Sequence, residues 1–189
     1  MKRMLSRFSV LAAAFLFTAA AVPALAQTKN DPENTLYLQV KGGRVTIQLL
    51  PDIAPKHVAR IKQLVRQKFY DGIVFHRVIP GFMAQTGDPQ GTGTGGSKFP
   101  DLPAEFSPYP YKRGTVGMAR TSDPNSANSQ FFICFDNSGC SGLTGQYTVW
   151  GQVVAGMGAI DKVKKGAPGS GAVTNPDKMI SVRVAADVK

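Results

Sequence analysis

The feature that most constrains the fold is a series of short segments in which apolar and polar residues alternate, because a period of two is typical of strands. The clearest case is the pair of segments 36–40 and 45–49, in which every second residue is Leu, Val or Ile. Gly42-Gly43 lies between them, and this arrangement predicts a β-hairpin with a two-glycine turn. A chain with many such segments is expected to pair them into a sheet.

The remaining segments predict a mainly β domain with two helices. Apolar residues recur at helical spacing from Val58 to Phe69, after Pro55, which suits a first helical turn. They predict an amphipathic helix of about four turns, and a second, short helix is predicted at 157–164. Clusters of Gly and Pro separate the other predicted strands, which are 73–78, 114–119, 130–135, 147–154 and 180–184. Many strands with two helices predict a closed barrel capped at its ends.

Residues 1–26 have the order of a secretory signal peptide. Basic residues precede an uncharged apolar stretch at 8–21, and Ala24-Leu25-Ala26 provides a small-residue cleavage site. The apolar stretch is too short for a membrane anchor, which needs about 20 apolar residues. We therefore expect cleavage near Ala26, no stable membrane insertion afterwards, and a periplasmic or secreted protein with one domain at 27–189.

The chain is strongly basic, with a formal net charge of +10, which raises the question of a nucleic-acid partner. Its basic residues are scattered, without interleaved aromatic residues or a nucleic-acid motif, so we expect no nucleic-acid binding. Residues 91–96 satisfy the G-x-G-x-x-G dinucleotide pattern, but Pro89 and Pro100 bracket them and no βαβ pattern surrounds them. We interpret this segment as a loop.

The residue inventory excludes several classes of enzyme. The predicted domain has two histidines, His57 and His76, and no HExxH, CxxC or carboxylate cluster with metal-ligand spacing, so we expect neither a metal nor another cofactor. It has no G-x-S-x-G motif and no arrangement typical of a catalytic triad. Cys134 and Cys140 could form a disulfide in an oxidising compartment, or Cys134 could be an unpaired buried residue, and the sequence leaves both open.

Three runs place polar side chains among large apolar ones. They are Phe75-His76-Arg77-Val78-Ile79-Pro80-Gly81-Phe82-Met83-Ala84-Gln85, Met118-Ala119-Arg120 and Ser129-Gln130-Phe131-Phe132-Ile133-Cys134. In the third run, alternation puts Gln130 and Phe132 on one face, so that this face can meet a ligand while the other fills a core. By residue type alone, the aromatic residues are also consistent with a core on both faces.

These runs closely resemble the cyclophilin family of peptidyl-prolyl cis-trans isomerases, and the resemblance extends from about Leu36 to Val184. It implies a closed, eight-stranded, antiparallel β-barrel capped by two α-helices. The reaction of this family needs neither proton transfer nor a nucleophile. Amide resonance imposes a barrier of about 18–20 kcal/mol, and twisting the bond returns a lone pair to the proline nitrogen. A guanidinium that donates to this lone pair favours the twisted state, and Arg77 is the candidate because Arg stays charged.

The resemblance also assigns the other site residues. The catalytic group comprises Arg77, Gln85 and Phe82, and the substrate-binding group comprises His76, Met83, Ala119, Arg120, Gln130, Phe132, Leu143 and Tyr147. The apolar members would hold the proline ring, whereas Gln85 and Gln130 would bind the substrate backbone and orient Arg77. The Arg120 backbone would pair with an extended peptide. Alternation favours a packed, hydrogen-bonded His76, and His57 is expected at the surface of the first helix.

Three positions depart from the best-known eukaryotic pattern of the family. Gly142 stands where a Trp commonly precedes the residue that matches Leu143, so we expect weak cyclosporin binding with isomerisation intact. Tyr147 takes the place of a His, and Arg120 takes the place of a common Asn. The loop 135–142 is also longer than usual in the family.

The leading hypothesis is a monomeric, exported isomerase that acts on proline-containing polypeptides and accelerates the folding of other exported proteins, in which X-Pro isomerisation is often rate limiting. The alternative is a peptide-binding chaperone or adaptor that uses the same groove without functional turnover. The presence of both Arg77 and Gln85 favours catalysis, because a protein that only binds could lose them.

Overall fold

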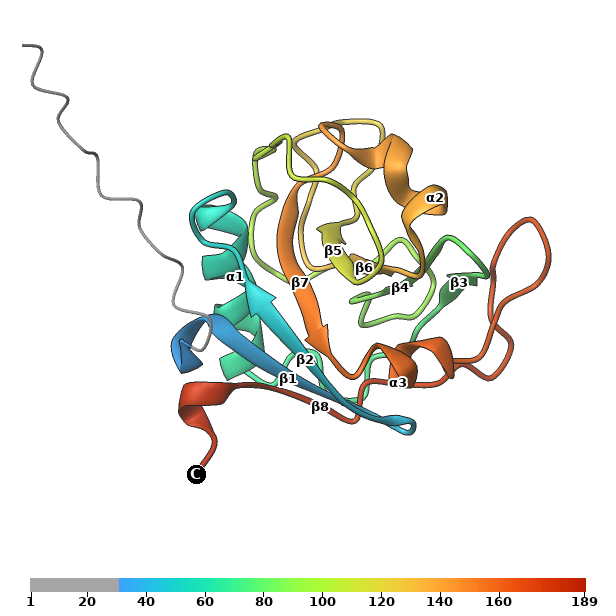
Figure 1. Ribbon diagram of the computed structural model, residues 1–189, viewed down its shortest axis with the longest axis horizontal. Coiled ribbons are helices and arrows are strands. Elements are labelled where there is room, and N and C mark those ends of the chain that lie inside the picture. Colours follow the sequence, from blue (N-terminus) through green and yellow to red (C-terminus); the bar gives the residue numbers. More distant parts are fainter. Residues whose placement is uncertain (1–30) are drawn as a thin grey trace, which may run out of the picture.

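The computed structural model describes residues 31–189 (Figure 1). The predicted signal peptide and the first residues of the predicted domain lie outside this range. Its strands are β1 (Thr35–Val40), β2 (Gly43–Leu49), β3 (Arg77–Ile79), β4 (Met83–Thr86), β5 (Thr115–Met118), β6 (Phe131–Cys134), β7 (Val149–Ala155) and β8 (Ser181–Val184). They form one antiparallel sheet in the order β3-β4-β6-β5-β7-β2-β1-β8. The prediction of a mainly β fold with eight antiparallel strands is confirmed.

The sheet curls (Figure 1), and its two ends are joined by backbone hydrogen bonds beside the edge strands. In the described chain, β3 and β8 are not paired with each other directly. Instead, the N–H of Phe75 donates to the carbonyl of Asp177 at 2.9 Å, and the N–H of Gly72 donates to the carbonyl of Met179 at 2.7 Å. The barrel is therefore closed by the segments that precede the two edge strands, and not by a ladder between these strands.

The helices within residues 31–189 are α1 (Pro55–Arg66), α2 (Asn137–Cys140) and α3 (Met157–Asp161), with 3₁₀ turns η1 (Pro32–Asn34), η2 (Ser141–Leu143) and η3 (Ala185–Asp187). The two predicted helices are α1, which packs against β7 and β8, and α3, which packs against β2. Helix α2 is an additional element. None of the described helices is long and apolar enough to cross a membrane.

Helix α1 starts at Pro55, and its first turn is capped by a residue far along the chain. Ala54 offers no side-chain cap, and the carboxylate of Glu105 accepts hydrogen bonds from the N–H groups of Lys56 at 3.1 Å and His57 at 3.0 Å. The His57 ring is fully buried, with Nδ1 2.6 Å from the Glu105 carboxylate. The prediction of a surface His57 is wrong, because a loop carboxylate gives this ring a buried partner.

Local boundaries differ from the predicted ones where the alternation fails. The hairpin turn is Lys41-Gly42 rather than Gly42-Gly43, since Gly43 already pairs with Val40. Strand β4 was not predicted, because Met83 and Ala84 are both buried and the run has no alternating pattern.

The buried apolar side chains form two clusters. The larger one joins the buried face of α1 to the strands. The smaller one, which we call the second core, consists of Leu50, Met83, Tyr111, Phe132, Cys134, Cys140 and Val149. Several predicted site residues belong to the second core or pack against it, so this cluster supports one wall of the candidate site.

Candidate active site

A row of cross-strand neighbours forms the base of the site. Arg77 on β3 is opposite Gln85 on β4, which is opposite Phe132 on β6. Phe132 is in turn opposite Gly117 on β5. Residues opposite one another on neighbouring strands project from the same face of a sheet. The register therefore places a cation, an amide and an aromatic ring side by side, and the next position in the row, Gly117, has no side chain.

A cavity of about 200 Å³ lies at this row. It is lined by Arg77, Phe82, Met83, Gln85, Ala119, Arg120, Phe132, Leu143 and Tyr147. Every one of these residues is among the site residues predicted from the sequence. Of the remaining two, Gln130 lines a neighbouring cavity and His76 lines neither.

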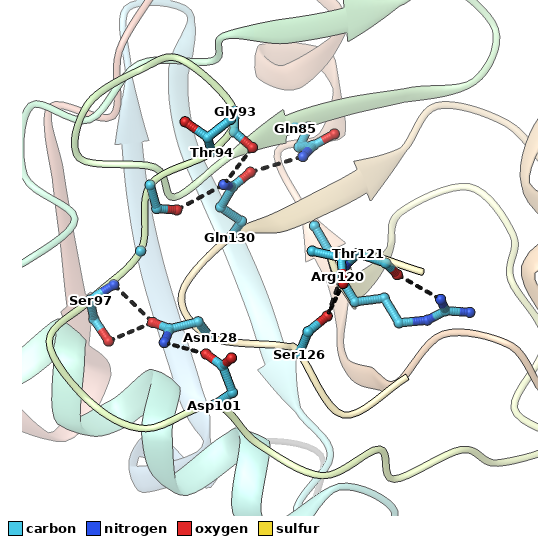
Figure 2. Close-up of a pocket in the computed structure, with 13 residues that line it drawn as sticks. Gln85, Gly93, Thr94, Ser97, Asp101, Arg120, Thr121, Ser126, Asn128 and Gln130 are labelled. Carbon is cyan, nitrogen blue, oxygen red and sulfur yellow. Dashed lines mark hydrogen bonds between the residues drawn. The ribbon is translucent and has the colours of Figure 1, made fainter. Parts of the chain in front are cut away.

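The neighbouring cavity is larger, at about 460 Å³, and most of the side chains that line it are polar. It shares Gln85, Ala119 and Arg120 with the first cavity, and segments 93–97 and 121–128 supply most of its other walls. Figure 2 shows these segments facing each other across it, with Gln130 between them. The two cavities therefore form one groove, which we call the binding groove.

The guanidinium of Arg77 is held from two sides. Its Nη1 donates to Oε1 of Gln85 at 3.3 Å, and its Nε donates to the carbonyl of Ser170 at 3.2 Å. Gln85 donates from Nε2 to Oε1 of Gln130 at 2.9 Å, and Figure 2 shows these two amides meeting end to end. Within the described chain no acceptor binds Nη2, so this nitrogen can donate to a ligand in the cavity.

The Phe132 ring is fixed by two tyrosines. Tyr111 stacks on it with ring centroids 5.7 Å apart, and Tyr147 meets it edge to face at 5.8 Å. The Tyr111 phenol fills the space above Gly117, where a Cβ would lie 1.9 Å from the phenol oxygen. Sequence reasoning missed Tyr111, because it lies in a proline-rich loop with no periodic pattern.

The side chain of Arg120 links two segments of the groove wall. Its guanidinium lies over the Tyr147 ring, 4.4 Å from the centroid, and donates from Nε and Nη2 to the carbonyl of Gln146 at 3.3 and 3.0 Å. Only a backbone contact was expected of Arg120. The structure adds that its side chain holds the Tyr147 segment against segment 119–121.

The wall that carries Leu143 is tied to the sheet by the cysteines. Cys134 at the end of β6 and Cys140 at the end of α2 form a disulfide, which decides between the two alternatives left open by the sequence. A Cβ at Gly142 would meet nothing within 4 Å. In the family that the sequence resembles, a Trp is common at this position, so the open space at Gly142 corresponds to the missing indole.

His76 is packed behind the groove. The residue is 9% exposed, and neither ring nitrogen has a hydrogen-bond partner in the described residues. The packing was predicted, but the expected hydrogen bond is absent. Burial lowers the pKa of His76, and the opposing effect of nearby Asp88 is smaller, so the ring is neutral at pH 7.

The site combines a charged hydrogen-bond donor, the Arg77 guanidinium, with an apolar surface that includes Phe132. Burial raises the pKa of Tyr111, so this phenol stays protonated and is no general base at neutral pH. The described residues contain no group of three or more His, Cys, Asp or Glu side chains that could hold a metal ion. The geometry suits binding an apolar ring and polarising an adjacent group through hydrogen bonds.

Comparison with known proteins agrees with this geometry. Residues 35–184 match the family model described as cyclophilin type peptidyl-prolyl cis-trans isomerase. A protein of Brucella suis biovar 1 named probable peptidyl-prolyl cis-trans isomerase is 57% identical over 195 residues, which cover 96% of this chain and 97% of the relative.

Solved structures give the same result for the fold. The cyclophilin AquaCyp293 from Hirschia baltica superposes with a TM-score of 0.75 and 29% identity, covering 84% of this chain and 76% of the other. A cyclophilin type peptidyl-prolyl cis-trans isomerase of Cryptosporidium parvum, crystallised in the presence of the dipeptide Ala-Pro, superposes with a TM-score of 0.73 and 26% identity, covering 79% and 98%.

Proposed function

This chain belongs to the cyclophilin family of peptidyl-prolyl cis-trans isomerases, and we propose that Arg77 drives its isomerisation reaction and that its physiological substrates are exported proteins. The observation that carries the first part is the position of the Arg77 guanidinium. Gln85 and Ser170 hold it, and Arg77 lines the same cavity as Phe132.

The proposed mechanism stabilises the twisted X-Pro amide. The proline ring packs on Phe132, with Phe82, Met83 and Leu143 around it, and the guanidinium donates to the proline nitrogen. That nitrogen carries a free lone pair only while the bond is twisted, so the hydrogen bond favours the transition state over both planar isomers. Lowering the barrier by about 7 kcal/mol would accelerate isomerisation about 10⁵-fold.

A polypeptide rather than a single amino acid is the expected substrate. The larger cavity continues from the proline pocket along segments 93–97 and 121–128, so residues that flank the proline can extend into it. The Cryptosporidium parvum relative was crystallised in the presence of a dipeptide that contains proline. We assign the same class of substrate, an X-Pro segment in an extended conformation, to the binding groove of this chain.

The first experiment is a cis-to-trans rate assay on an X-Pro peptide with purified residues 27–189. Arg77→Ala is expected to lower kcat/KM by about 10²- to 10³-fold, the usual cost of one transition-state donor. Arg44→Ala is the matched control, since Arg44 is exposed and lies over Tyr37 on the hairpin. Unchanged turnover in a folded Arg77→Ala variant would contradict the mechanism and favour the peptide-binding chaperone or adaptor.

Export is supported by two features. Residues 1–26 have the composition of a signal peptide, and the Cys134–Cys140 disulfide suits an oxidising compartment. We therefore propose that this isomerase acts on proteins that fold after export. We also propose that it works as a monomer in the periplasm or the medium.

Expression of the full chain in a bacterium tests the export proposal. Cell fractionation is expected to recover the protein outside the cytoplasm. Its intact mass should correspond to a chain that starts at Gln27, and a thiol assay should detect no free cysteine. Replacing Lys2, Arg3 and Arg7 by Gln should impair export, because these charges form the basic start of the signal. A full-length protein retained in the cytoplasm of wild-type cells would refute this part.

A further inference from the structure

A buried carboxylate that the mechanism does not use lies beside the binding groove. Asp88 follows β4 and is only 1% exposed. Its Oδ1 accepts a hydrogen bond from the N–H of Gln90 at 2.8 Å, and its Oδ2 accepts from the N–H groups of Thr92 at 2.9 Å and Gly93 at 2.6 Å. The Thr92 hydroxyl adds a fourth donor at 3.2 Å. A buried charge is tolerated only when it is hydrogen-bonded in this way.

The hydrogen bonds keep this carboxylate ionised. Burial alone would raise its pKa, but the backbone donors of Gln90 and Gly93 and the side-chain donor of Thr92 outweigh burial and hold the pKa of Asp88 at about 2. In the described chain Asp88 forms no salt bridge. Its charge therefore acts on the backbone of the loop at 90–95.

The carboxylate determines the path of this loop. Gly93 has a φ of +89°, a left-handed conformation that L side chains rarely adopt. A Cβ on Gly95 would lie 2.1 Å from Oδ1 of Asp88, so only glycine allows the loop to wrap this closely. The carbonyls of Gly93 and Gly95 then both accept from Nε2 of Gln130, at 3.0 and 2.8 Å (Figure 2).

These two carbonyls fix the orientation of two amides in series. Because carbonyls only accept, Gln130 must turn its Nε2 toward the loop and its Oε1 toward Gln85. Gln85 must then donate from Nε2, which leaves its Oε1 facing Nη1 of Arg77. If the loop carbonyls moved and Gln130 flipped, Gln85 would present an NH₂ group to a guanidinium that can only donate.

We propose that Asp88 is a positioning residue for Arg77, acting through the loop carbonyls of Gly93 and Gly95 and the amides of Gln130 and Gln85. This inference rests on the proposed role of Arg77 in isomerisation. In this role a carboxylate outside both cavities keeps an acceptor, Oε1 of Gln85, in front of the guanidinium.

The test compares Asp88→Asn with wild type in the cis-to-trans assay. Asn replaces one acceptor oxygen by an NH₂ group that faces backbone donors, so the loop must shift. We expect kcat to fall about tenfold, the effect of roughly one misplaced charged hydrogen bond, with a smaller change in KM. Asp71→Asn is the matched control, because Asp71 accepts from the N–H of Val182 and pairs with Arg183 outside both cavities.

A double-mutant cycle separates positioning from a general loss of structure. In a Gln130→Met background the series of amides is already broken, so adding Asp88→Asn should leave kcat unchanged. Losses in kcat that multiply in the double variant would overturn the proposal. The Arg77 Nε–H signal in ¹⁵N NMR is a second readout, expected to shift in Asp88→Asn and to stay in place in Asp71→Asn.

A milder variant covers the case in which Asp88→Asn does not fold. Thr92→Val keeps the carboxylate and removes the hydroxyl that donates to Asp88 and contacts Thr94. We expect kcat to fall only about two- to threefold, because the backbone donors to the carboxylate remain. Unchanged kcat and an unchanged Arg77 signal in this variant would overturn the positioning role. If instead Arg77→Ala retains full turnover, the mechanism itself fails, so the two failures are distinguishable.

Discussion

The floor of the smaller cavity depends on the absence of a side chain at one position. Gly117 is the cross-strand neighbour of Phe132, and the Tyr111 phenol occupies the position that a side chain at 117 would take. A Cβ there would lie 1.9 Å from the Tyr111 oxygen and 2.9 Å from Cζ of Phe132. Tyr111 also donates its backbone N–H to the Thr144 hydroxyl at 3.1 Å, next to Leu143. One buried tyrosine therefore braces both the floor and the wall of the pocket.

At this residue scale, Gly117→Ala is expected to raise KM for the X-Pro peptide and to destabilise the protein by about 1–3 kcal/mol, as overpacking does. Combining it with Tyr111→Leu should cost less than the sum of the two changes, because the smaller side chain frees the space. Kinetics and thermal unfolding of the four proteins measure this. Gly158→Ala is the matched control, since a Cβ there meets nothing within 4 Å. Additive losses would show that the two residues do not share this space.

At the scale of elements, strand register assembles the site. Arg77, Gln85 and Phe132 come from three strands, and a slip of one residue in any of them would turn its side chain to the opposite face. The disulfide adds a second constraint, because it holds α2 near the end of β6 and with it the start of η2, which carries Leu143. The strand register therefore fixes Arg77, Gln85 and Phe132, and the disulfide fixes the segment that carries Leu143, so that both parts of the cavity wall are held in place.

The whole molecule buries both of its histidines, and this predicts how its stability depends on pH. Burial lowers the pKa of His57 below the ordinary 6.5, despite the neighbouring Glu105, and burial also lowers the pKa of His76. Below pH 6.5 the unfolded chain therefore binds protons that the folded protein excludes. The contribution of the two neutral histidines to the free energy of unfolding should be fully present above pH 6.5. It should decrease as the pH falls, by up to about 1.4 kcal/mol per pH unit for each histidine.

Chemical denaturation between pH 7.5 and pH 5 measures this dependence. The window lies above the ordinary pKa values of the carboxylates, so the histidines dominate it. His57→Gln, which can still donate a hydrogen bond to Glu105, should reduce the slope. A free energy of unfolding that stays constant or increases from pH 7.5 to pH 5 would contradict the prediction.

The sequence by itself determined the elements with regular periodicity, namely the hairpin, α1 and most strands, because local alternation shows which face of a segment is buried without knowledge of what packs against it. The roles predicted for Arg77, Gln85 and Phe132 came from the resemblance of the sequence to the cyclophilin family. The tertiary structure decided the rest: the Tyr111 phenol above Gly117, Glu105 beneath His57, and the loop around Asp88 that orients Gln130. Each of these contacts depends on backbone paths through irregular loops, or on residues far apart along the chain. No local pattern encodes them, and they form only once the folded sheet and its loops bring the partners together.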